Sequence, residues 1–176
     1  MKEIFMDFAK YNGWANARLL DQAQELSEEQ QSRVIVSSFP GIYKTFLHLW
    51  NAERAWLRRM QGQEQLSITE DPFGGSFSEL SAGLKQVDQS WSEWIAAVPP
   101  DPYLETTITY HNSKGQQNTL PRRVVLMQII NHSSYHRGQI TTMLRQLGIE
   151  KIPATDFLVW TFQQSAAAAS APAKPS

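Results

Sequence analysis

Residues 121–148 read PRRVVLMQIINHSSYHRGQITTMLRQLG and form the longest and best-marked helical stretch of the chain. Thr119 and Pro121 open it, because the first turn of a helix tolerates the missing N–H of a proline. Gly148 is expected to end it. Apolar residues at helical spacing predict one buried face, made by Val125, Ile129, Ile140, Met143 and Leu147.

Two histidines of this stretch, His132 and His136, stand four residues apart on the same face. Burying two imidazoles without partners is costly, so hydrogen-bonded side chains, water or a metal ion must satisfy them. From the residues alone, the pair either binds a metal or consists of two hydrogen-bonded core histidines. Zinc proteases of the His-Glu-x-x-His type carry a glutamate after the first histidine, whereas this chain has Ser133, which excludes that class.

Working outward, two further helices are predicted in the first third of the chain. Apolar residues recur every three or four positions over residues 2–25, which predicts an amphipathic first helix. A second helix is expected to begin with Pro40 in its first turn, capped by Ser38, and to stop at Gly62.

The middle of the chain predicts a third helix followed by a small insertion. Ser76 or Ser78 is expected to cap this helix, and Pro99 with the next proline ends it. Residues 106–120, TTITYHNSKGQQNTL, combine two short β-prone runs with a turn-rich centre, which predicts a β-hairpin before the last long helix.

The predicted fold class is therefore all-α, a four-helix bundle with a small β-hairpin insertion. Residues 156–162, DFLVWTF, predict a final helical turn capped by Asp156. From Ser165 onward the chain contains only small and polar residues, so we expect a single domain over residues 1–164 and a disordered Ala/Ser/Pro tail over 165–176.

Composition narrows the function classes. The chain has 176 residues, 41% of them hydrophobic, and a net charge of -1 without a basic block, so nucleic acid is not the expected partner. There is no cysteine, so disulfides, thiolate nucleophiles and cysteine-ligated metals are excluded. No membrane partner is expected, because no apolar run is long enough to span a bilayer, and without a secretory signal the default location is cytoplasmic.

The other two histidines are less clearly marked. His48 lies in the second predicted helix beside Gly41, Thr45 and Ala52, whose small side chains leave room for a cavity. Periodicity alone allows either a ligand or a histidine at the edge of a helix interface. His111 lies in the polar turn of the hairpin and is expected to be solvated.

Three segments together resemble the DinB family of the DinB/YfiT-like superfamily: residues 11–20, YNGWANARLL; residues 37–60, SSFPGIYKTFLHLWNAERAWLRRM; and residues 131–148, NHSSYHRGQITTMLRQLG. The resemblance covers residues 2–163. It implies a four-helix bundle with a long crossover connection and a divalent metal site. The implied ligands are three histidines: His48, His132 and His136.

The resemblance also implies a type of chemistry. Three neutral imidazoles leave the charge of an ion uncompensated and a coordination position open, so a metal-bound water or thiol would be the reacting group. Zinc, nickel, iron or manganese would suit the site. Relatives in the superfamily include bacillithiol S-transferases and a mycothiol-dependent maleylpyruvate isomerase, and because this chain has no cysteine, any thiol comes from outside. The family also implies a homodimer, and its link to DNA damage implies no DNA binding.

Three functions follow from these observations. The first is a metal-dependent transferase that joins a low-molecular-weight thiol to a small electrophile. The second is a metal-dependent hydrolase, and the third is a non-enzymatic stress protein that binds a metal or a small molecule. The residues alone do not decide whether the protein is an enzyme, and the resemblance favours the first function.

Three polar residues near the histidines complete the candidate site. Glu53 lies in the apolar arc of its helix, where it either pairs with an arginine such as Arg18 or Arg137 or serves the site as a catalytic group. Gln128 and Gln139 are placed to hold the imidazole N–H groups behind the ligands, or else to be interface amides.

Overall fold

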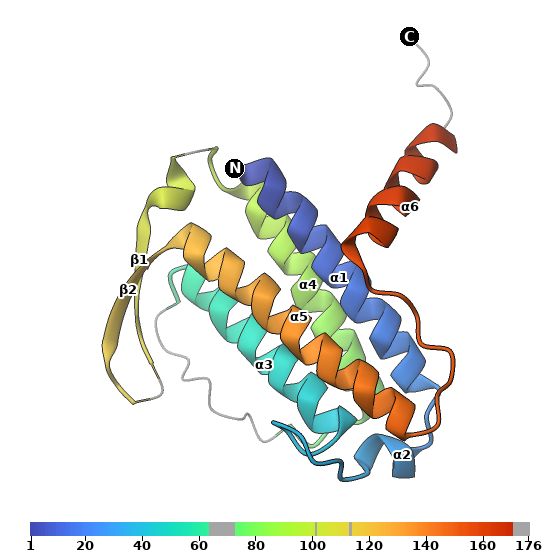
Figure 1. The fold of residues 1–176 in the computed structure, drawn as a ribbon. Coiled ribbons are helices and arrows are strands. Elements are labelled where there is room, and N and C mark those ends of the chain that lie inside the picture. The colour runs from blue at the N-terminus through green and yellow to red at the C-terminus, as the bar shows by residue number, and fades with distance from the viewer. Residues whose placement is uncertain (64–72, 101, 113, 171–176) are drawn as a thin grey trace.

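A computed structural model describes residues 1–63, 73–100, 102–112 and 114–170. Four long helices form a bundle (Figure 1), which confirms the all-α fold class. Their bounds are α1 Lys2–Gln24, α3 Ile42–Met60, α4 Phe77–Ala97 and α5 Arg122–Gln146. The first of these agrees with the predicted helix over residues 2–25 to within one residue.

The bundle contains the expected long crossover connection. α1 packs against α4 and α5, and α3 packs against the same two helices. Consecutive helices α3 and α4 run in the same direction, as do α1 and α5 (Figure 1), so the end of α3 and the start of α4 lie at opposite ends of the bundle. Residues 64–72 of that connection lie outside the described residues.

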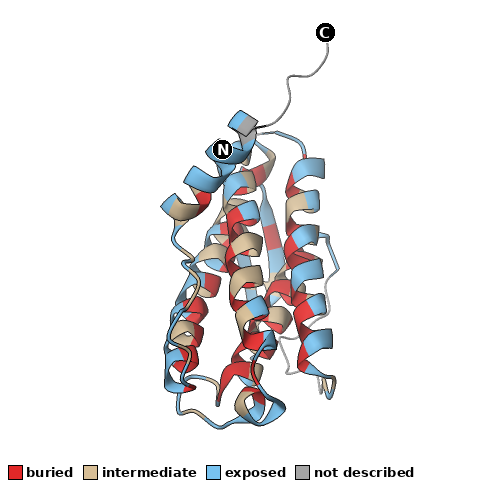
Figure 2. Ribbon diagram, turned by 90° about the vertical axis from the view of Figure 1, so that its right-hand side faces the viewer, coloured by how far each residue is buried: buried red, intermediate tan, exposed pale blue. Residues whose placement is uncertain are grey.

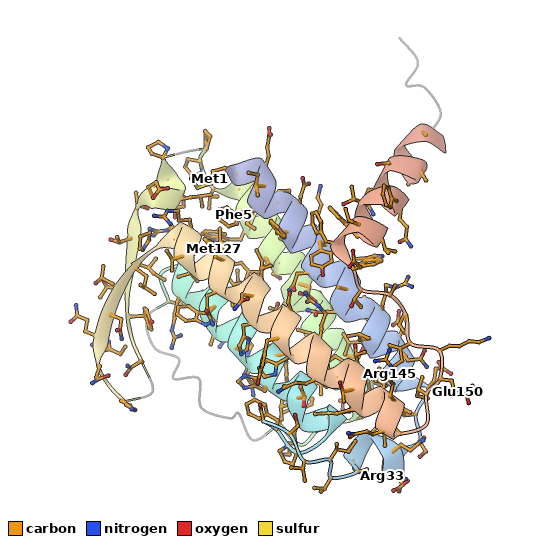
Figure 3. All side chains as sticks on the ribbon, viewed as in Figure 1. Met1, Phe5, Arg33, Met127, Arg145 and Glu150 are labelled. Atoms are coloured by element: carbon orange, nitrogen blue, oxygen red, sulfur yellow. The ribbon has the colours of Figure 1, made fainter. Side chains whose placement is uncertain are left out.

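The hydrophobic core of the bundle has two large clusters, one at each end, and a third, small cluster joins α1 to Trp160. The cluster at the start of α1 includes Phe5, Trp91 and Val125, and the cluster at the end of α1 includes Leu20 and Phe46. Figure 2 shows the buried residues on the inward faces of the helices, and Figure 3 places Met1, Phe5 and Met127 near one end and Arg33, Arg145 and Glu150 near the other. Between the two clusters lies the part of the bundle that carries the polar residues described below.

The predicted hairpin is confirmed. Strands β1 (Thr107–His111) and β2 (Gln117–Pro121) pair antiparallel and follow the short 3-10 helix η1 (Tyr103–Glu105). Thr119, predicted to open the last helix, belongs to β2 instead, where it lies opposite Thr109 of β1. The hydroxyl groups of these two threonines are 3.0 Å apart across the strands. The helix α5 begins one residue after Pro121.

The predicted helix cap at Ser76 is confirmed, and the predicted helix cap at Ser38 is wrong. Ser76 accepts a hydrogen bond from the backbone N–H of Glu79, whose side chain accepts in return from the backbone N–H of Ser76. The helix α3 starts after Gly41, which has a φ of 96° and packs where a Cβ would lie 2.3 Å from the carbonyl oxygen of Arg33. Only glycine fits this position. Because the φ of Gly41 is not helical, Gly41 lies outside the helix, and the helix cannot begin at Pro40 before it.

The end of α5 follows the predicted signal. Gly148 has a φ of 91°, and the backbone N–H of Ile149 donates to the carbonyl of Leu144 at 3.0 Å. The N–H of Gly148 donates to Arg145 at 3.0 Å, which completes a Schellman motif. A glycine at this position therefore ends the helix and holds its last carbonyls.

Two helices differ from the prediction. A short helix, α2 (Glu28–Ser32), lies between the first two predicted helices, where no helix was predicted, and is held by a capping box between Ser27 and Gln30. The helix α6 (Phe157–Ser170) begins at its predicted cap, Asp156, but continues beyond Ser165, where the sequence predicted a disordered tail. Alanines favour the helical state even without tertiary contacts, which accounts for the extension. The rest of the predicted tail, 171–176, lies outside the described residues.

Within the described ranges, no helix combines the length and the hydrophobicity needed to cross a bilayer. The longest, α5, has 25 residues, but charged and polar side chains such as Arg137 interrupt it.

Candidate metal centre

Three histidines from two helices meet in the middle of the bundle. The Nε2 atom of His132 lies 3.0 Å from Nε2 of His48 and 3.1 Å from Nε2 of His136. One ligand atom from each of the three lies within 4.8 Å of the others. The structure thus brings together all three residues of the implied ligand set.

The two helices explain this convergence. His132 and His136 lie one turn apart on α5, and α3 packs beside α5 with the opposite direction. On α3, the buried residues Thr45 and Ala52 lie about one turn to either side of His48. Because both side chains are small, the imidazole of His48 can reach the histidine pair across the interface.

A glutamine fixes the orientation of one imidazole. Oε1 of Gln139 lies 2.8 Å from Nδ1 of His136, and Nε2 of Gln139 donates to the hydroxyl of Ser38 at 2.8 Å. With its amide nitrogen engaged by Ser38, Gln139 presents its oxygen to His136, so Nδ1 carries the proton and Nε2 keeps a free lone pair. Gln139 therefore occupies the position expected of a residue behind the ligands.

Gln128 does not share this arrangement. Its side chain is exposed, and among the described residues no hydrogen bond joins it to any of the three histidines. The prediction that it holds an imidazole finds no support in the geometry.

The electrostatics favour three neutral imidazoles. Burial, together with the neighbouring histidines, lowers the pKa of His48 and of His132 to about 4. Burial also lowers the pKa of His136, although the contact with Gln139 opposes the shift. Neutral imidazole is the form that binds metal ions, so at neutral pH the cluster is ready to act as a ligand set.

The geometry fits a bound ion. Three Nε2 acceptors that face one another repel unless a proton or a cation lies between them. With metal–nitrogen bonds of about 2.0–2.1 Å in a tetrahedral site, ligand nitrogens are separated by about 3.3 Å. Two of the three separations, 3.0 and 3.1 Å, lie close to that value, and the ligand atoms of His48 and His136 lie within 4.8 Å of each other. Three imidazoles without a carboxylate also leave a coordination position open, as in catalytic sites.

An aromatic side chain that the sequence analysis did not identify covers the cluster. The ring of Phe39 stacks on His48 with the ring centroids 3.9 Å apart and also lies 5.7 Å from His136. The hydroxyl of Tyr135 lies 3.3 Å from Ser38, which precedes Phe39. No periodicity marks the segment before α3, and Ser38 was expected to be a helix cap. Only the folded structure therefore shows that Phe39 covers the histidine cluster.

Glu53 lies outside the histidine cluster. Its carboxylate is fully buried and accepts hydrogen bonds from Ser133 at 2.6 Å and from the amides of Asn12 and Asn16. Among the described residues no direct ion pair joins Glu53 to Arg137, whose guanidinium donates to those two asparagines. Glu53 is therefore held by a buried network, and the expected pairing with an arginine runs through amide side chains.

The structure also shows where Arg18 and His111 lie. Arg18, the second expected partner of Glu53, lies over the ring of Trp14 at 5.0 Å. His111 is exposed in the hairpin and does not belong to the cluster. It is thus a histidine of the same chain that can serve as an internal control.

Comparisons with known proteins agree with this architecture. The sequence model of the DinB family matches residues 1–167 of this chain. Protein DinB of Bacillus subtilis (strain 168) is 27% identical over 167 residues, which cover 92% of this chain and 96% of the relative. An uncharacterized protein of the same organism, YizA, is 22% identical over 156 residues, covering 85% of this chain and 92% of the relative.

A solved structure shows the same fold. The crystal structure of a DinB-like protein from Bacillus cereus ATCC 10987 superposes with a TM-score of 0.69 at 24% identity. The match covers 86% of this chain and 95% of that chain. Because the family model matches residues 1–167, almost the whole chain, the protein belongs to the DinB family.

Proposed function

We propose that this protein binds one divalent transition metal ion through His48, His132 and His136 and joins a low-molecular-weight thiol to a small electrophile. The convergence of the Nε2 atoms of three partly or fully buried histidines is the observation that carries the proposal. Zinc, nickel, iron and manganese all suit such a donor set, and supply in the cell selects among them.

A metal ion held by the three histidines would supply a Lewis acid that lowers the pKa of a bound thiol. In the transfer, a sulfur–carbon bond forms, the thiol proton passes to solvent, and the leaving group departs with its electron pair. Because the chain has no cysteine, the thiol has to be a second substrate.

The side chains around the histidines have separate tasks. Gln139 keeps the proton of His136 on Nδ1 and leaves Nε2 free. Phe39 shields the imidazole of His48 from water on one side. Tyr135, 59% exposed, places a hydroxyl at the rim, where it can contact a polar group of the substrate.

Glu53 gives no support to the hydrolytic alternative. A general base has to reach the proton it removes, directly or through one water. The carboxylate of Glu53 is fully buried, and its Oε1 already accepts hydrogen bonds from Ser133, Asn12 and Asn16. The geometry therefore favours a reaction that needs no carboxylate base at the site.

The metal site is tested by elemental analysis of protein purified without a histidine tag or added metal. We expect about one equivalent of a transition metal in the wild type and its loss in His48→Ala and His136→Ala. His111→Ala removes an exposed histidine and should keep the metal. Substoichiometric metal that is the same in all four proteins would contradict the proposed site.

The reaction is tested with the metal-loaded protein, a chromogenic electrophile and three thiols: glutathione, coenzyme A and bacillithiol. We expect turnover with at least one thiol and its loss in His48→Ala. Equal rates in His48→Ala would contradict the proposed transferase. Stoichiometric metal without turnover for any pair would instead support a protein that binds the metal and catalyses no transfer.

We also propose that the protein forms a homodimer and that a small molecule, rather than nucleic acid or a membrane, is its other partner. Leu158 and Phe162 on α6 are 60% and 68% exposed, and this helix extends away from the bundle (Figure 1). Large apolar side chains grouped on an exposed helix are common at protein interfaces. Sedimentation equilibrium distinguishes a dimer from the monomer that would contradict this proposal.

A further inference from the structure

A buried polar layer separates the two hydrophobic clusters at the height of the histidines. None of its members is more than 4% exposed, and together they come from all four long helices. The polar layer consists of Asn12, Asn16, Glu53, Asp88, Ser133 and Arg137. Buried polar groups of this kind persist only when their hydrogen bonds and charges are satisfied.

The layer contains two carboxyl groups and one guanidinium. Nδ2 of Asn12 lies 3.1 Å from Oε1 of Glu53 and 3.2 Å from Oδ1 of Asp88, so one amide group touches both carboxyls. Asn16 bridges the same two groups. If both carboxyls were ionised, two negative charges would lie side by side against the single positive charge of Arg137.

One oxygen in this layer lacks a donor. Oε2 of Glu53 is buried and has no hydrogen-bond partner among the described residues. A proton on the neighbouring Asp88 would supply the missing donor and would also balance the charges. Consistent with this, burial and the charge of Glu53 raise the pKa of Asp88 well above its ordinary value, although Asn16 and Arg137 act in the opposite direction.

The surroundings assign the proton to Asp88. Ser133 donates to Glu53 at 2.6 Å, a short bond typical of an ionised acceptor, whereas no hydroxyl donates to Asp88 among the described residues. Beside Asp88 lies a mainly apolar cavity of about 20 Å³, lined by Trp91 and Ile129, which has room for about one water molecule. One water molecule cannot replace the full hydration shell of an ionised carboxylate.

We propose that Asp88 is a neutral carboxylic acid that donates its proton to Glu53, and that the unit formed with Arg137 positions the histidine-bearing part of α5. Charged or polar groups face Asp88 from each packed helix: Glu53 from α3, Arg137 from α5, and Asn12 and Asn16 from α1. On α4 itself, Lys85 points away and bonds the exposed Asp21.

The positioning role follows from the order of residues on α5. Ser133 follows His132 and donates to Glu53, and Arg137 follows His136 and donates to both asparagines. Each histidine of the pair is thus anchored by its next residue to the other helices. This part of the inference rests on the proposed metal site, whereas the buried proton does not.

Two isosteric substitutions separate the roles of the carboxyls. The amide of Asp88→Asn can donate to Glu53 and accept from the asparagines as the acid does, so we expect an unfolding midpoint close to that of the wild type at pH 7. Glu53→Gln removes the counter-charge of Arg137 and should lower the midpoint clearly. Asp21→Asn, an exposed control on α1, should change nothing. Equal destabilisation by Asp88→Asn and Glu53→Gln would overturn the assignment of the proton.

Infrared spectroscopy detects the proton directly. The carbonyl stretch of a protonated carboxylic acid is separate from the bands of carboxylates. We expect this band in the wild type and in Asp21→Asn at pH 7, and its absence in Asp88→Asn. A wild-type spectrum without the band would overturn the proposal, whatever the stability data show.

The pH dependence of stability gives a second readout. A carboxyl whose pKa is raised by folding binds its proton more tightly in the folded state, so its stabilising contribution is lost as the pH rises through the folded pKa. Above the ordinary value of 3.8, the folding constant of the wild type should fall up to tenfold per pH unit relative to Asp88→Asn. Parallel curves for the two proteins would contradict a proton on Asp88.

The positioning role is tested by titration with Co²⁺, whose absorption reports the ligand geometry. Asp88→Asn should bind Co²⁺ with the wild-type affinity and spectrum, and Glu53→Gln should bind at least tenfold more weakly with an altered spectrum. A spectrum and affinity unchanged in Glu53→Gln would overturn the positioning role. A wild type that binds no Co²⁺ would contradict the metal site and the positioning role, while the infrared band would still decide the proton.

Discussion

The histidine cluster and the polar layer lie next to each other in the same bundle, yet they differ in how their polar atoms are satisfied. In the polar layer, amide, hydroxyl and guanidinium donors face carboxyl and amide acceptors, and almost every group is paired. In the cluster, three Nε2 atoms face one another, so at most a proton or a cation can join them. The layer therefore satisfies nearly all of its polar atoms within the chain, whereas the cluster has the donor atoms to hold an added cation.

The largest expected effect comes from breaking the polar layer. Arg137→Met leaves Glu53 charged and buried without its counter-charge, which should lower the free energy of unfolding by about 3–5 kcal/mol. Urea unfolding at pH 7 measures the change. Arg145→Met, on the exposed side of the same helix, should stay within about 0.5 kcal/mol of the wild type. Equal losses in both variants would show that the layer is not a special structural unit.

The next effect comes from removing the metal from the cluster. At a free metal concentration of about 100 to 1,000 times the dissociation constant, a bound ion stabilises the folded state by about 2.7–4.1 kcal/mol. We expect a chelator to lower the melting temperature of the wild type and of His111→Ala, but not that of His48→Ala. A melting temperature that ignores the chelator in the wild type would argue that the cluster, like the layer, is complete without a cation.

A smaller effect sharpens the role of the residue behind His136. Gln139→Leu removes the acceptor for the Nδ1 proton and should weaken metal binding about 10- to 100-fold. Gln128→Leu, on the exposed side of α5, is the matched control and should leave the affinity unchanged. Competition with a chromophoric chelator measures both constants, and equal affinities in the two variants would remove Gln139 from the site.

The smallest effect is the pH dependence of the metal-free protein. Because folding lowers the pKa of His48 and of His132 to about 4, the unfolded chain binds more protons between that value and the ordinary 6.5. The contribution of these histidines to stability is thus present above pH 6.5 and lost as the pH falls towards 4. His132→Ala should show a shallower loss than the wild type in acid unfolding curves. Asp88 acts in the opposite direction in both proteins, so their difference isolates the histidines; identical slopes would contradict neutral, buried imidazoles.

The two regions also differ in how far the sequence predicts them. Local signals predict the helices, the cap at Ser76 and the stop at Gly148, because these depend on spacing and on backbone geometry within a few residues. The pair of histidines on α5 follows from a spacing of four residues on one helix. His48, on another helix, entered the ligand set through the family resemblance.

The polar layer could not be predicted in the same way. Asp88 was not identified as a site residue, and Glu53 was assigned two alternative roles, because their partners come from other helices. No local spacing encodes contacts between positions 76 residues apart, such as Asn12 and Asp88. Phe39 escaped prediction for the same reason, since only the folded chain stacks it on His48.

The central claim, that the three histidines bind a metal ion, is tested most directly by anomalous diffraction from crystals of the metal-loaded protein. The account predicts one strong peak about 2.0–2.1 Å from Nε2 of each of His48, His132 and His136. The peak should be missing in crystals of His48→Ala grown under the same conditions. A peak elsewhere on the chain, or none between these imidazoles at saturating metal, would contradict it.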